Sequence, residues 1–187
     1  MGSNTERLDD EEVQVQDSAR EDQLARLLGL RRMPGRHGHD AEDKTGNRYE
    51  LKTTTKGGVG TGRDVSQQMI DEWRKRYWIC AKGRNLRRGF QIDELFFLSP
   101  AMMEEWFQQM EDKFVADRDL RDKVLSATSG AITAVEEQRV RYLLDRGMTY
   151  NNPHISWNYV RTHGLSLDPR TGQDQLRAMV ERYPLKR

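Results

Sequence analysis

The chain has 187 residues with a formal net charge of +1, and 35 % of its residues are hydrophobic while 33 % are charged. This length fits a single domain, and four Trp, six Tyr and five Phe residues supply enough apolar surface for a modest core, which excludes full disorder. No apolar run approaches the roughly 18 residues of a membrane span, the acidic start is unlike a signal peptide, and the single cysteine, Cys80, excludes an internal disulfide, so we expect a cytoplasmic protein without membrane partners.

The first predicted element is a short helix that follows an acidic stretch over residues 1–14. Leu24, Leu27 and Leu28 have helical spacing, Asp17 or Ser18 can cap the start, and Gly29 lies near the end. The helix is short, so its leucine stripe needs another surface to pack against.

Residues 34–52 lack the helical spacing of the preceding segment. Proline, several glycines and a Lys-Thr-Gly-Asn turn signal flank short segments there. This pattern predicts a β-hairpin whose second strand runs from Tyr49 to Thr55. The glycine-rich stretch that follows, residues 57–62, lacks the Gly-Lys-Ser/Thr ending of a phosphate-binding loop, so we expect a mobile loop there.

From Val65 onward, helical and strand-like periodicities alternate. Helices are expected at residues 65–75, from Ser99 and Pro100 through Phe114, from the Thr133–Glu136 capping box to Gly147, at 155–162 and at 174–183. Strands are expected at Tyr77–Ala81 and Phe90–Leu98, on either side of a basic turn. Together these elements predict an α/β fold in which a small mixed β-sheet is flanked by helices.

The stretch from Arg74 to Arg88 carries a concentration of positive charge. Its cations are Arg74, Lys75, Arg76, Lys82, Arg84, Arg87 and Arg88. A basic face on a neutral protein is compatible with DNA binding, although charge alone favours a solvated surface with scattered cations.

The residues that carry chemistry lie in the predicted hairpin. Glu50 and Lys52 share one face of a strand while Leu51 points into the core, and the hairpin can bring Asp40 beside them. Two converging carboxylates form an all-oxygen site that suits Mg²⁺, and the lysine can act on charge that develops on a phosphate. An ordinary surface strand with a salt bridge is the alternative interpretation of the spacing.

The Glu-x-Lys spacing alone is a weak signal, because the chain contains two further copies of it. Glu42-Asp43-Lys44 leads into a turn, and Glu111-Asp112-Lys113 lies in a predicted helix, where residues two apart do not share a face. Only residues 50–52 combine an apolar middle residue, a strand context and an upstream acid.

The hairpin resembles the active-site hairpin of the PvuII-type restriction endonucleases, a family of the PD-(D/E)xK nuclease superfamily. The matching residues are Pro34-Gly35-Arg36, Gly38, Asp40-Ala41, Asp43, Gly46 and Tyr49-Glu50-Leu51-Lys52. Weaker similarity extends over residues 15–100 and 150–165. It includes Val15-Gln16-Asp17 with the leucine helix, Trp73-Arg74, Trp78-Ile79, Arg84, Asn151-Asn152-Pro153, Tyr159-Val160 and His163-Gly164.

Position by position, the resemblance implies a restriction-endonuclease-like core with Asp40, Glu50 and Lys52 as catalytic residues. It also implies Mg²⁺ ligation by Asp40, Glu50 and the backbone carbonyl of Leu51. Asp17 would lie on the dimer and minor-groove side.

For DNA contacts, the resemblance implies that Asn151 and Asn152 lie at base edges, and we assign His154 to the same DNA-binding segment. An Asn side chain can bond adenine bidentately. A turn before Pro153 explains the Asn pair equally well when the family match is set aside.

Two departures from the family pattern affect recognition and catalysis. The family's guanine-reading histidine tract is missing, and Arg63 and Asp64 stand near its place. Arg63 is suited to read guanine, but it is equally suited to contact phosphate. Trp73 occupies the place of an active-site tyrosine, so a hydroxyl is missing there.

His37 and His39 beside Asp40 also permit a zinc site, although no further ligand cluster is obvious and a solvated or phosphate-flanking histidine is the simpler interpretation.

The leading hypothesis is a Mg²⁺-dependent type II restriction endonuclease of a bacterial or archaeal cytoplasm. Such an enzyme is a homodimer without a small-molecule cofactor that hydrolyses both strands of a short palindrome in double-stranded DNA and leaves 5′-phosphates. A homing or repair endonuclease on the same fold and a non-catalytic DNA-binding protein are the alternatives. We expect one nuclease domain over residues 1–187, with a dimerisation helix (15–33), a catalytic core (34–100), a helical insertion (117–147) and a recognition and C-terminal segment (150–187).

Overall fold

A computed structural model describes residues 18–33, 38–86, 89–147 and 149–185. Its centre is a six-stranded mixed sheet, which confirms the predicted fold class. The strand order is β1 (Arg31–Arg32), β2 (Ala41–Glu42), β3 (Arg48–Thr54), β5 (Tyr77–Leu86), β6 (Gly89–Leu98) and β8 (Leu165–Ser166). β3 and β5 are parallel, and the other neighbouring strands of this sheet are antiparallel.

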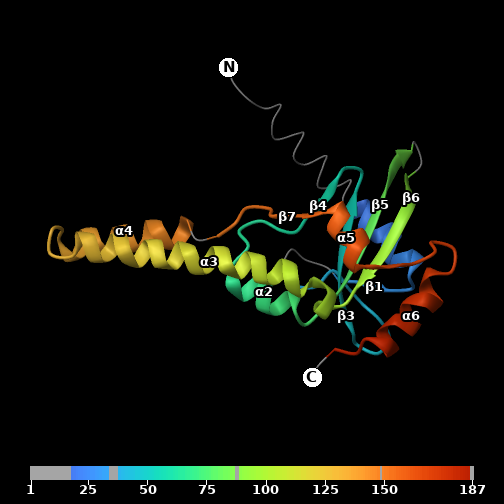
Figure 1. The fold of residues 1–187 in the computed structure, drawn as a ribbon. Helices are drawn as coiled ribbons and strands as arrows, with labels where there is room; N and C mark the ends of the chain where they lie inside the picture. The colour runs from blue at the N-terminus through green and yellow to red at the C-terminus, as the bar shows by residue number, and fades with distance from the viewer. Residues whose placement is uncertain (1–17, 34–37, 87–88, 148, 186–187) are drawn as a thin grey trace, which may run out of the picture.

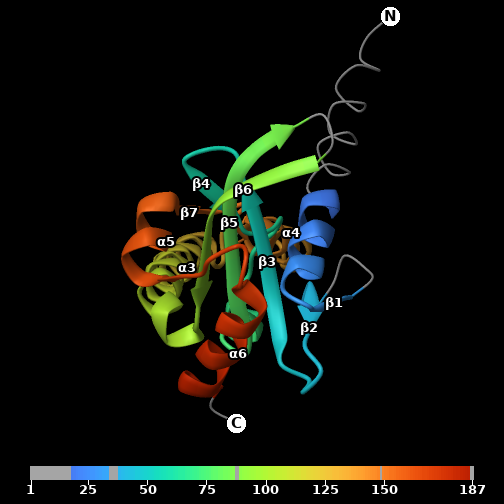
Figure 2. The ribbon, with the colours of Figure 1, turned by 90° about the vertical axis from the view of Figure 1, so that its right-hand side faces the viewer.

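Helices cover both faces of the sheet (Figures 1 and 2). On one face lie α2 (Gln67–Trp73), α3 (Pro100–Thr128) and α5 (Trp157–His163), and on the other lie a helix over residues 18–27 and α6 (Gly172–Arg182). The alternation of β5 explains this arrangement, because Trp78 and Cys80 belong to the first core cluster while Tyr77, Ile79 and Ala81 belong to the second. A strand buried on both faces has the continuous apolar character that this segment shows.

The leucine stripe of the N-terminal helix packs inside its own chain. Leu24 and Leu28 are 0 % and 2 % exposed and belong to the core cluster that contains Tyr49 and Leu51 of β3. The stripe therefore covers the chain's own sheet, and its apolar character gives no reason to expect a second chain on it.

The prediction of a mobile glycine loop is wrong. Gly58–Gly60 form β4, which pairs antiparallel with β7 (His154–Ser156), and an isolated bridge joins Val65 to Tyr150. Glycine has a low strand propensity, and the pairing partner lies far along the chain, so local sequence did not indicate a strand. Because β7 occupies residues 154–156, the next helix, expected to begin at residue 155, begins at Trp157.

The remaining predicted elements are present with shifted ends. The hairpin forms from β2 and β3, the expected helix 65–75 is shortened to α2, and β5 extends to Leu86, so the expected basic turn begins later in the chain. α6 covers residues 172–182 where 174–183 was expected. Thr133 and Glu136 form the expected capping box at the start of α4 (Ala134–Gly147).

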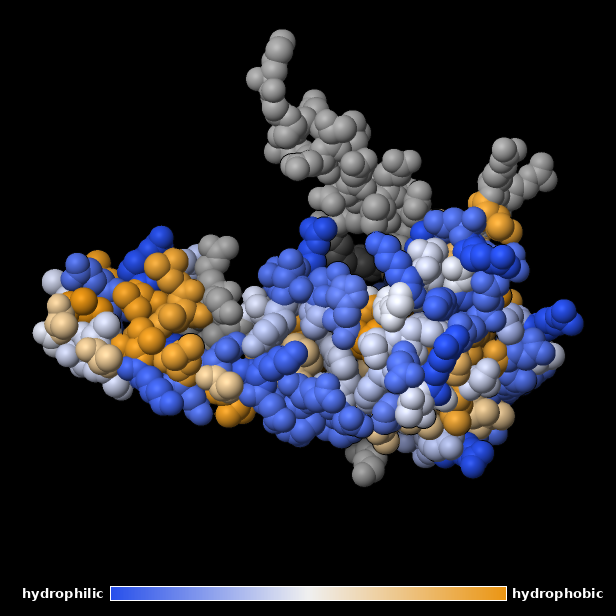
Figure 3. Space-filling model, turned by 45° about the horizontal axis from the view of Figure 1, so that its top comes forward, coloured by the Kyte–Doolittle hydropathy of each residue, from blue (hydrophilic) through white to orange (hydrophobic). Residues whose placement is uncertain are grey.

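Helices α3 and α4 form an arm that projects from the sheet (Figure 1). α3 is continuous through residue 117, so the expected insertion 117–147 consists of the outer half of α3 together with α4. Apolar residues gather on the surface of this arm (Figure 3), among them Leu120, Val135 and Leu143. Within the described part of the chain, no helix is long and apolar enough to cross a membrane.

Candidate active site

The first candidate region is the acidic hairpin, by which we mean β2, β3 and Asp40 directly before β2. The Asp40 N–H donates to the Tyr49 carbonyl at 2.9 Å, which continues the β2–β3 pairing past Ala41. Asp43 fixes the turn, because its Oδ1 atom accepts bonds from the backbone N–H groups of Thr45 (2.8 Å) and Asn47 (3.0 Å). The turn chemistry thus places Asp40 beside the middle of β3.

Asp40, Glu50 and Lys52 meet in the structure, as the hairpin interpretation expects. Lys52 Nζ lies 2.8 Å from Glu50 Oε1 and 3.6 Å from Asp40 Oδ2. The Leu51 N–H donates to Asp40 Oδ2 at 2.8 Å, while its side chain is 0 % exposed in the core. The alternation of β3 therefore orients both catalytic candidates toward Asp40 and anchors the strand through the residue between them.

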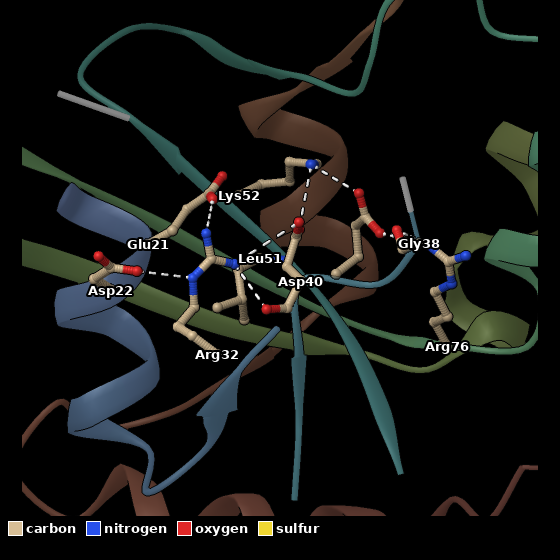
Figure 4. A network of polar contacts seen from close by, with 9 residues as sticks. Glu21, Asp22, Arg32, Gly38, Asp40, Leu51, Lys52 and Arg76 are labelled. Carbon is tan, nitrogen blue, oxygen red and sulfur yellow. Dashed lines mark hydrogen bonds and ion pairs between the residues drawn. The ribbon is translucent and has the colours of Figure 1, made fainter. Parts of the chain in front are cut away.

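Two arginines that the sequence did not single out as site residues flank these acids (Figure 4). Arg32 donates to the Asp40 carbonyl (2.8 Å) and to Glu21 and Asp22 of the N-terminal helix (2.9 Å each). Arg76, on the other side, donates to Glu50 Oε2 at 3.0 Å. Arg32 also lies 3.8 Å from Asp40 Oδ1, so the Asp40 and Glu50 carboxylates each have Lys52 on one side and an arginine on the other.

The crowding of charge shifts the ionisation of the site. Burial raises the pKa of Glu50, and the nearby Asp40 charge acts in the same direction. Burial also raises the pKa of Glu21 to about 7, and Asp40 again adds to the effect. For Lys52, burial opposes the charged form, but the carboxylates of Glu50, Asp40 and Glu21 outweigh it and raise the pKa, so the lysine keeps its proton.

The donor set of the acidic hairpin fits a hard divalent cation. The ammonium of Lys52 occupies the space between the Asp40 and Glu50 carboxylates, which shows that this space accepts positive charge. The N–H and C=O of one strand residue point toward the same edge, so the bond from the Leu51 N–H to Asp40 places the Leu51 carbonyl on that edge too.

In the described ranges, no group of three or more His, Cys, Asp or Glu side chains is arranged to hold a metal. Carboxylate, carbonyl and water oxygens are the ligands that Mg²⁺ takes. His39 contacts Glu42 at 2.7 Å. His37 of the expected zinc motif and Asp17 of the expected dimer side lie outside the described residues.

The structure brings the second set of predicted residues together on what we call the recognition ribbon, namely β4 and β7 with residues 61–65 and 150–153. The Asn152 N–H donates to the Gly62 carbonyl at 2.8 Å, Thr61 donates to the Pro153 carbonyl, and Gly60 pairs with His154. The five candidate DNA-binding side chains on this ribbon are all exposed: Arg63, Asp64, Asn151, Asn152 and His154. Two segments that are distant in sequence therefore present one continuous polar edge.

Asp64 and Asn152 have left-handed backbones, with φ of 51° and 50°. Asn and Asp tolerate this conformation better than other side chains. This requirement explains in part why these residue types stand there, independently of any DNA contact.

Arg74, Lys75, Arg76 and Arg84 do not form a shared basic face, as the favoured interpretation of this stretch, a solvated surface with scattered cations, expects. Arg74 binds Glu104 and Glu111, Lys75 binds Glu72, and Arg84 binds Asp93. These cations neutralise local acids, and Arg76 is buried. Only the burial of Arg76 departs from that interpretation.

Trp73 and Cys80 are both buried in the core and contribute to packing. Trp73 is 3 % exposed, and its ring meets Trp78 edge-on with 5.3 Å between centroids. Burial raises the pKa of Cys80 to about 12, so its thiol remains protonated and behaves as a core side chain.

Comparison with known families agrees with this geometry. The model of the family described as "Restriction endonuclease PvuII" matches residues 7–128, which is more than half of the chain and includes the whole acidic hairpin and α2. The chain belongs to the PvuII restriction endonuclease family.

Proposed function

We propose that this protein is a Mg²⁺-dependent type II restriction endonuclease that cuts both strands of a short palindromic DNA site and leaves 5′-phosphates. The observation that carries the proposal is the convergence of Asp40 and Glu50 on one cationic position, with the Lys52 ammonium 3.6 Å from Asp40 Oδ2 and 2.8 Å from Glu50 Oε1. A protein that only binds DNA has no use for paired acids facing a polyanion. They become useful when a divalent cation lies between them and the phosphate.

In the proposed reaction, a water oxygen attacks the scissile phosphorus and releases a proton to solvent, the P–O3′ bond breaks, and the leaving O3′ takes a proton from solvent. When bound, Mg²⁺ would polarise the phosphate and lower the pKa of a coordinated water. Asp40, Glu50 and the Leu51 carbonyl would hold the ion. Lys52 would act as a positively charged donor toward the phosphate oxygens, because its ammonium lies beside both carboxylates at the same centre.

Recognition is assigned to the recognition ribbon. We propose that Arg63 or Asp64, together with Asn151 and Asn152, reads base edges in the major groove, and that His154 contacts the same DNA. Support comes from their exposure on one edge whose main chain is fixed by bonds between the two segments. The side chains are thus free to bond DNA while their positions are set.

We also propose a homodimer, because a palindrome presents two equivalent strands to a chain with one candidate cleavage site. Dimerisation through residues 15–30 now rests on the family membership, since Leu24 and Leu28 are buried inside the chain. Sedimentation should give about twice the mass of one 21.9 kDa chain. A protein that stays monomeric on its DNA would contradict the dimer and favour nicking.

The decisive experiment is to digest a DNA of known sequence with the purified protein and to map both strands of every end. We expect discrete cuts at one short palindrome with Mg²⁺, no cuts with EDTA, and ends that accept label from a kinase only after phosphatase treatment. Cuts at long or damaged sites would support the homing or repair alternative. Specific binding without cleavage under any divalent cation would support a DNA-binding protein and overturn the proposal.

A further inference from the structure

Arg76 stands out among the charged residues because it is buried beside a catalytic candidate. It lies between the end of α2 and the start of β5, and its residue is 8 % exposed. Its Nη1 atom donates to Glu50 Oε2 at 3.0 Å and to the Gly38 carbonyl at 2.8 Å. Gly38 has a φ of 113°, a conformation that favours glycine, at the position whose carbonyl accepts from the arginine. One side chain thus connects β3 with the segment that enters Asp40.

The two oxygens of Glu50 have different partners as a result. Oε1 lies 2.8 Å from Lys52 Nζ, while Oε2 bonds Arg76. Asp40 repeats this division, since Oδ2 faces Lys52 at 3.6 Å and Oδ1 faces Arg32 at 3.8 Å. Each acid therefore turns one oxygen toward the shared centre and the other toward an outer arginine (Figure 4).

Stability alone is a poor explanation for Arg76. Burying an ion pair costs desolvation that is often not recovered, and the Nε atom of Arg76 is buried without a partner among the described atoms. A buried cation with one unsatisfied nitrogen is more easily explained by the orientation that it imposes on its two partners.

We propose that Arg76 is a positioning residue for the cleavage reaction, which holds Oε2 of Glu50 and leaves Oε1 as the oxygen that faces the cation and Lys52. The inference rests on the proposed function of the same site. Because Arg76 holds Oε2, Glu50 can offer only one oxygen, Oε1, to a cation. Ca²⁺ takes 6–8 oxygen ligands, whereas Mg²⁺ prefers fewer and stricter contacts. Releasing Oε2 should therefore favour Ca²⁺ over Mg²⁺ and disturb the geometry that the reaction needs.

The test compares Arg76→Met and Arg76→Lys with Arg74→Met as a matched control. Arg74 lies on the same segment, but it binds Glu104 and Glu111 away from the acidic hairpin. Calorimetry on the DNA-free protein gives the affinities for Ca²⁺ and Mg²⁺, and single-turnover digestion gives the cleavage rate. Thermal unfolding measures stability in the same samples.

We expect Arg76→Met to shift the Ca²⁺-to-Mg²⁺ affinity ratio at least about fivefold toward Ca²⁺. We expect it to slow single-turnover cleavage at saturating Mg²⁺ by about 10- to 100-fold. Arg76→Lys should keep the ratio within about twofold of the parent, because an ammonium can still hold Oε2. Arg74→Met should lower stability while leaving the affinity ratio unchanged.

An unchanged ratio in Arg76→Met would overturn the proposal, as would affinities for both ions that fall in parallel with stability. If Arg76→Met does not fold, Arg76→Gln takes its place, because the amide is uncharged and shorter. A parent protein that binds both ions but cuts no DNA would refute the proposed function, and the affinity ratio would still decide the positioning of Glu50.

Discussion

The acidic hairpin and the recognition ribbon differ in whether side chains or main chain make the hydrogen bonds. In the hairpin, the functional side chains are bonded to one another and largely withdrawn from solvent, with 13 % exposure for the Lys52 side chain and 7 % for Glu50. On the ribbon, the main chain carries the bonds, and the five candidate side chains are exposed. Catalysis needs side-chain atoms at fixed positions, whereas recognition needs free side chains on a fixed backbone. Substitutions in the two regions should therefore differ in kind.

The largest effect is expected from Lys52→Ala in the hairpin. Cleavage should fall by a factor on the order of 10²–10³ or more, while specific DNA binding in Ca²⁺ stays intact, because Lys52 acts on charge formed in the transition state. Single-turnover digestion and a binding titration measure the two quantities. A variant that cuts within tenfold of the parent would show that Lys52 is misassigned.

Glu21 of the N-terminal helix, which lies beside the acidic hairpin, provides a pH test. Glu21 has an ordinary pKa of 4.5 and a folded-state pKa of about 7, mainly because of burial and then because of Asp40. Between these values the folded protein keeps a proton that the unfolded chain releases, so this group's contribution to stability falls as the pH rises through that window.

Glu21→Gln removes the titrating group and keeps a hydrogen-bonding side chain. Without divalent cations, the variant should gain stability relative to the parent between pH 5 and pH 8, by at most about 3 kcal/mol. Denaturant unfolding at both pH values measures the gain, and Asp22→Asn controls for loss of an Arg32 contact. A stability difference that is the same at both pH values would refute the raised pKa of Glu21.

On the recognition ribbon, the expected effects are about 1–3 kcal/mol and concern base discrimination. Arg63→Ala should narrow the gap between the cognate site and sites altered at a G·C pair, and Asn152→Gly should do so at an A·T pair. Glycine is chosen because Asn152 has a φ of 50°, where alanine would add backbone strain. The measurement is binding in Ca²⁺ to single-base variants at fixed salt. Uniform weakening with a shallower salt dependence would identify a phosphate contact instead.

The smallest effect is expected from Gly60→Ala. A methyl group at Gly60 would overlap the side-chain amide of Asn152, which can rotate away. Stability should fall by less than about 1 kcal/mol, and discrimination should change at the base pair that Asn152 reads. Gly62→Ala is the control, because its methyl would make only an ordinary contact at 3.5 Å with Met69. Identical base preferences for Gly60→Ala and the parent would show that Asn152 does not read a base.

Sequence reasoning succeeded where the pattern is local. The alternation of Glu50, Leu51 and Lys52 and the turn before them predicted the acidic hairpin, and the fold class followed from the order of helical and strand-like segments. Both signals depend on neighbours within a few residues, which is the range over which propensity and periodicity act.

The missed features depend on contacts between distant segments. β4 exists because of β7, and the burial of Leu24 and Leu28 depends on the sheet beneath the helix. Arg76 belongs to the stretch predicted to carry scattered surface cations, yet it is buried. It lies in the bend directly before β5, two residues before Trp78, which is the partner of Glu50 in the parallel β3–β5 register. Its position beside Glu50 depends on that register and on the bend, and the sequence alone provides neither.

The bonds of Arg32 have a consequence for how this sequence can change over generations. One guanidinium joins Glu21, Asp22 and the Asp40 carbonyl, so loss of Arg32 removes a salt-bridge partner from two helix carboxylates near Asp40 at once. Loss of either acid alone leaves the arginine partly unpaired. We therefore expect related sequences to vary at positions 21, 22 and 32 together. Neutral side chains at all three positions leave no charge unpaired, whereas a change at one position removes a partner from the others.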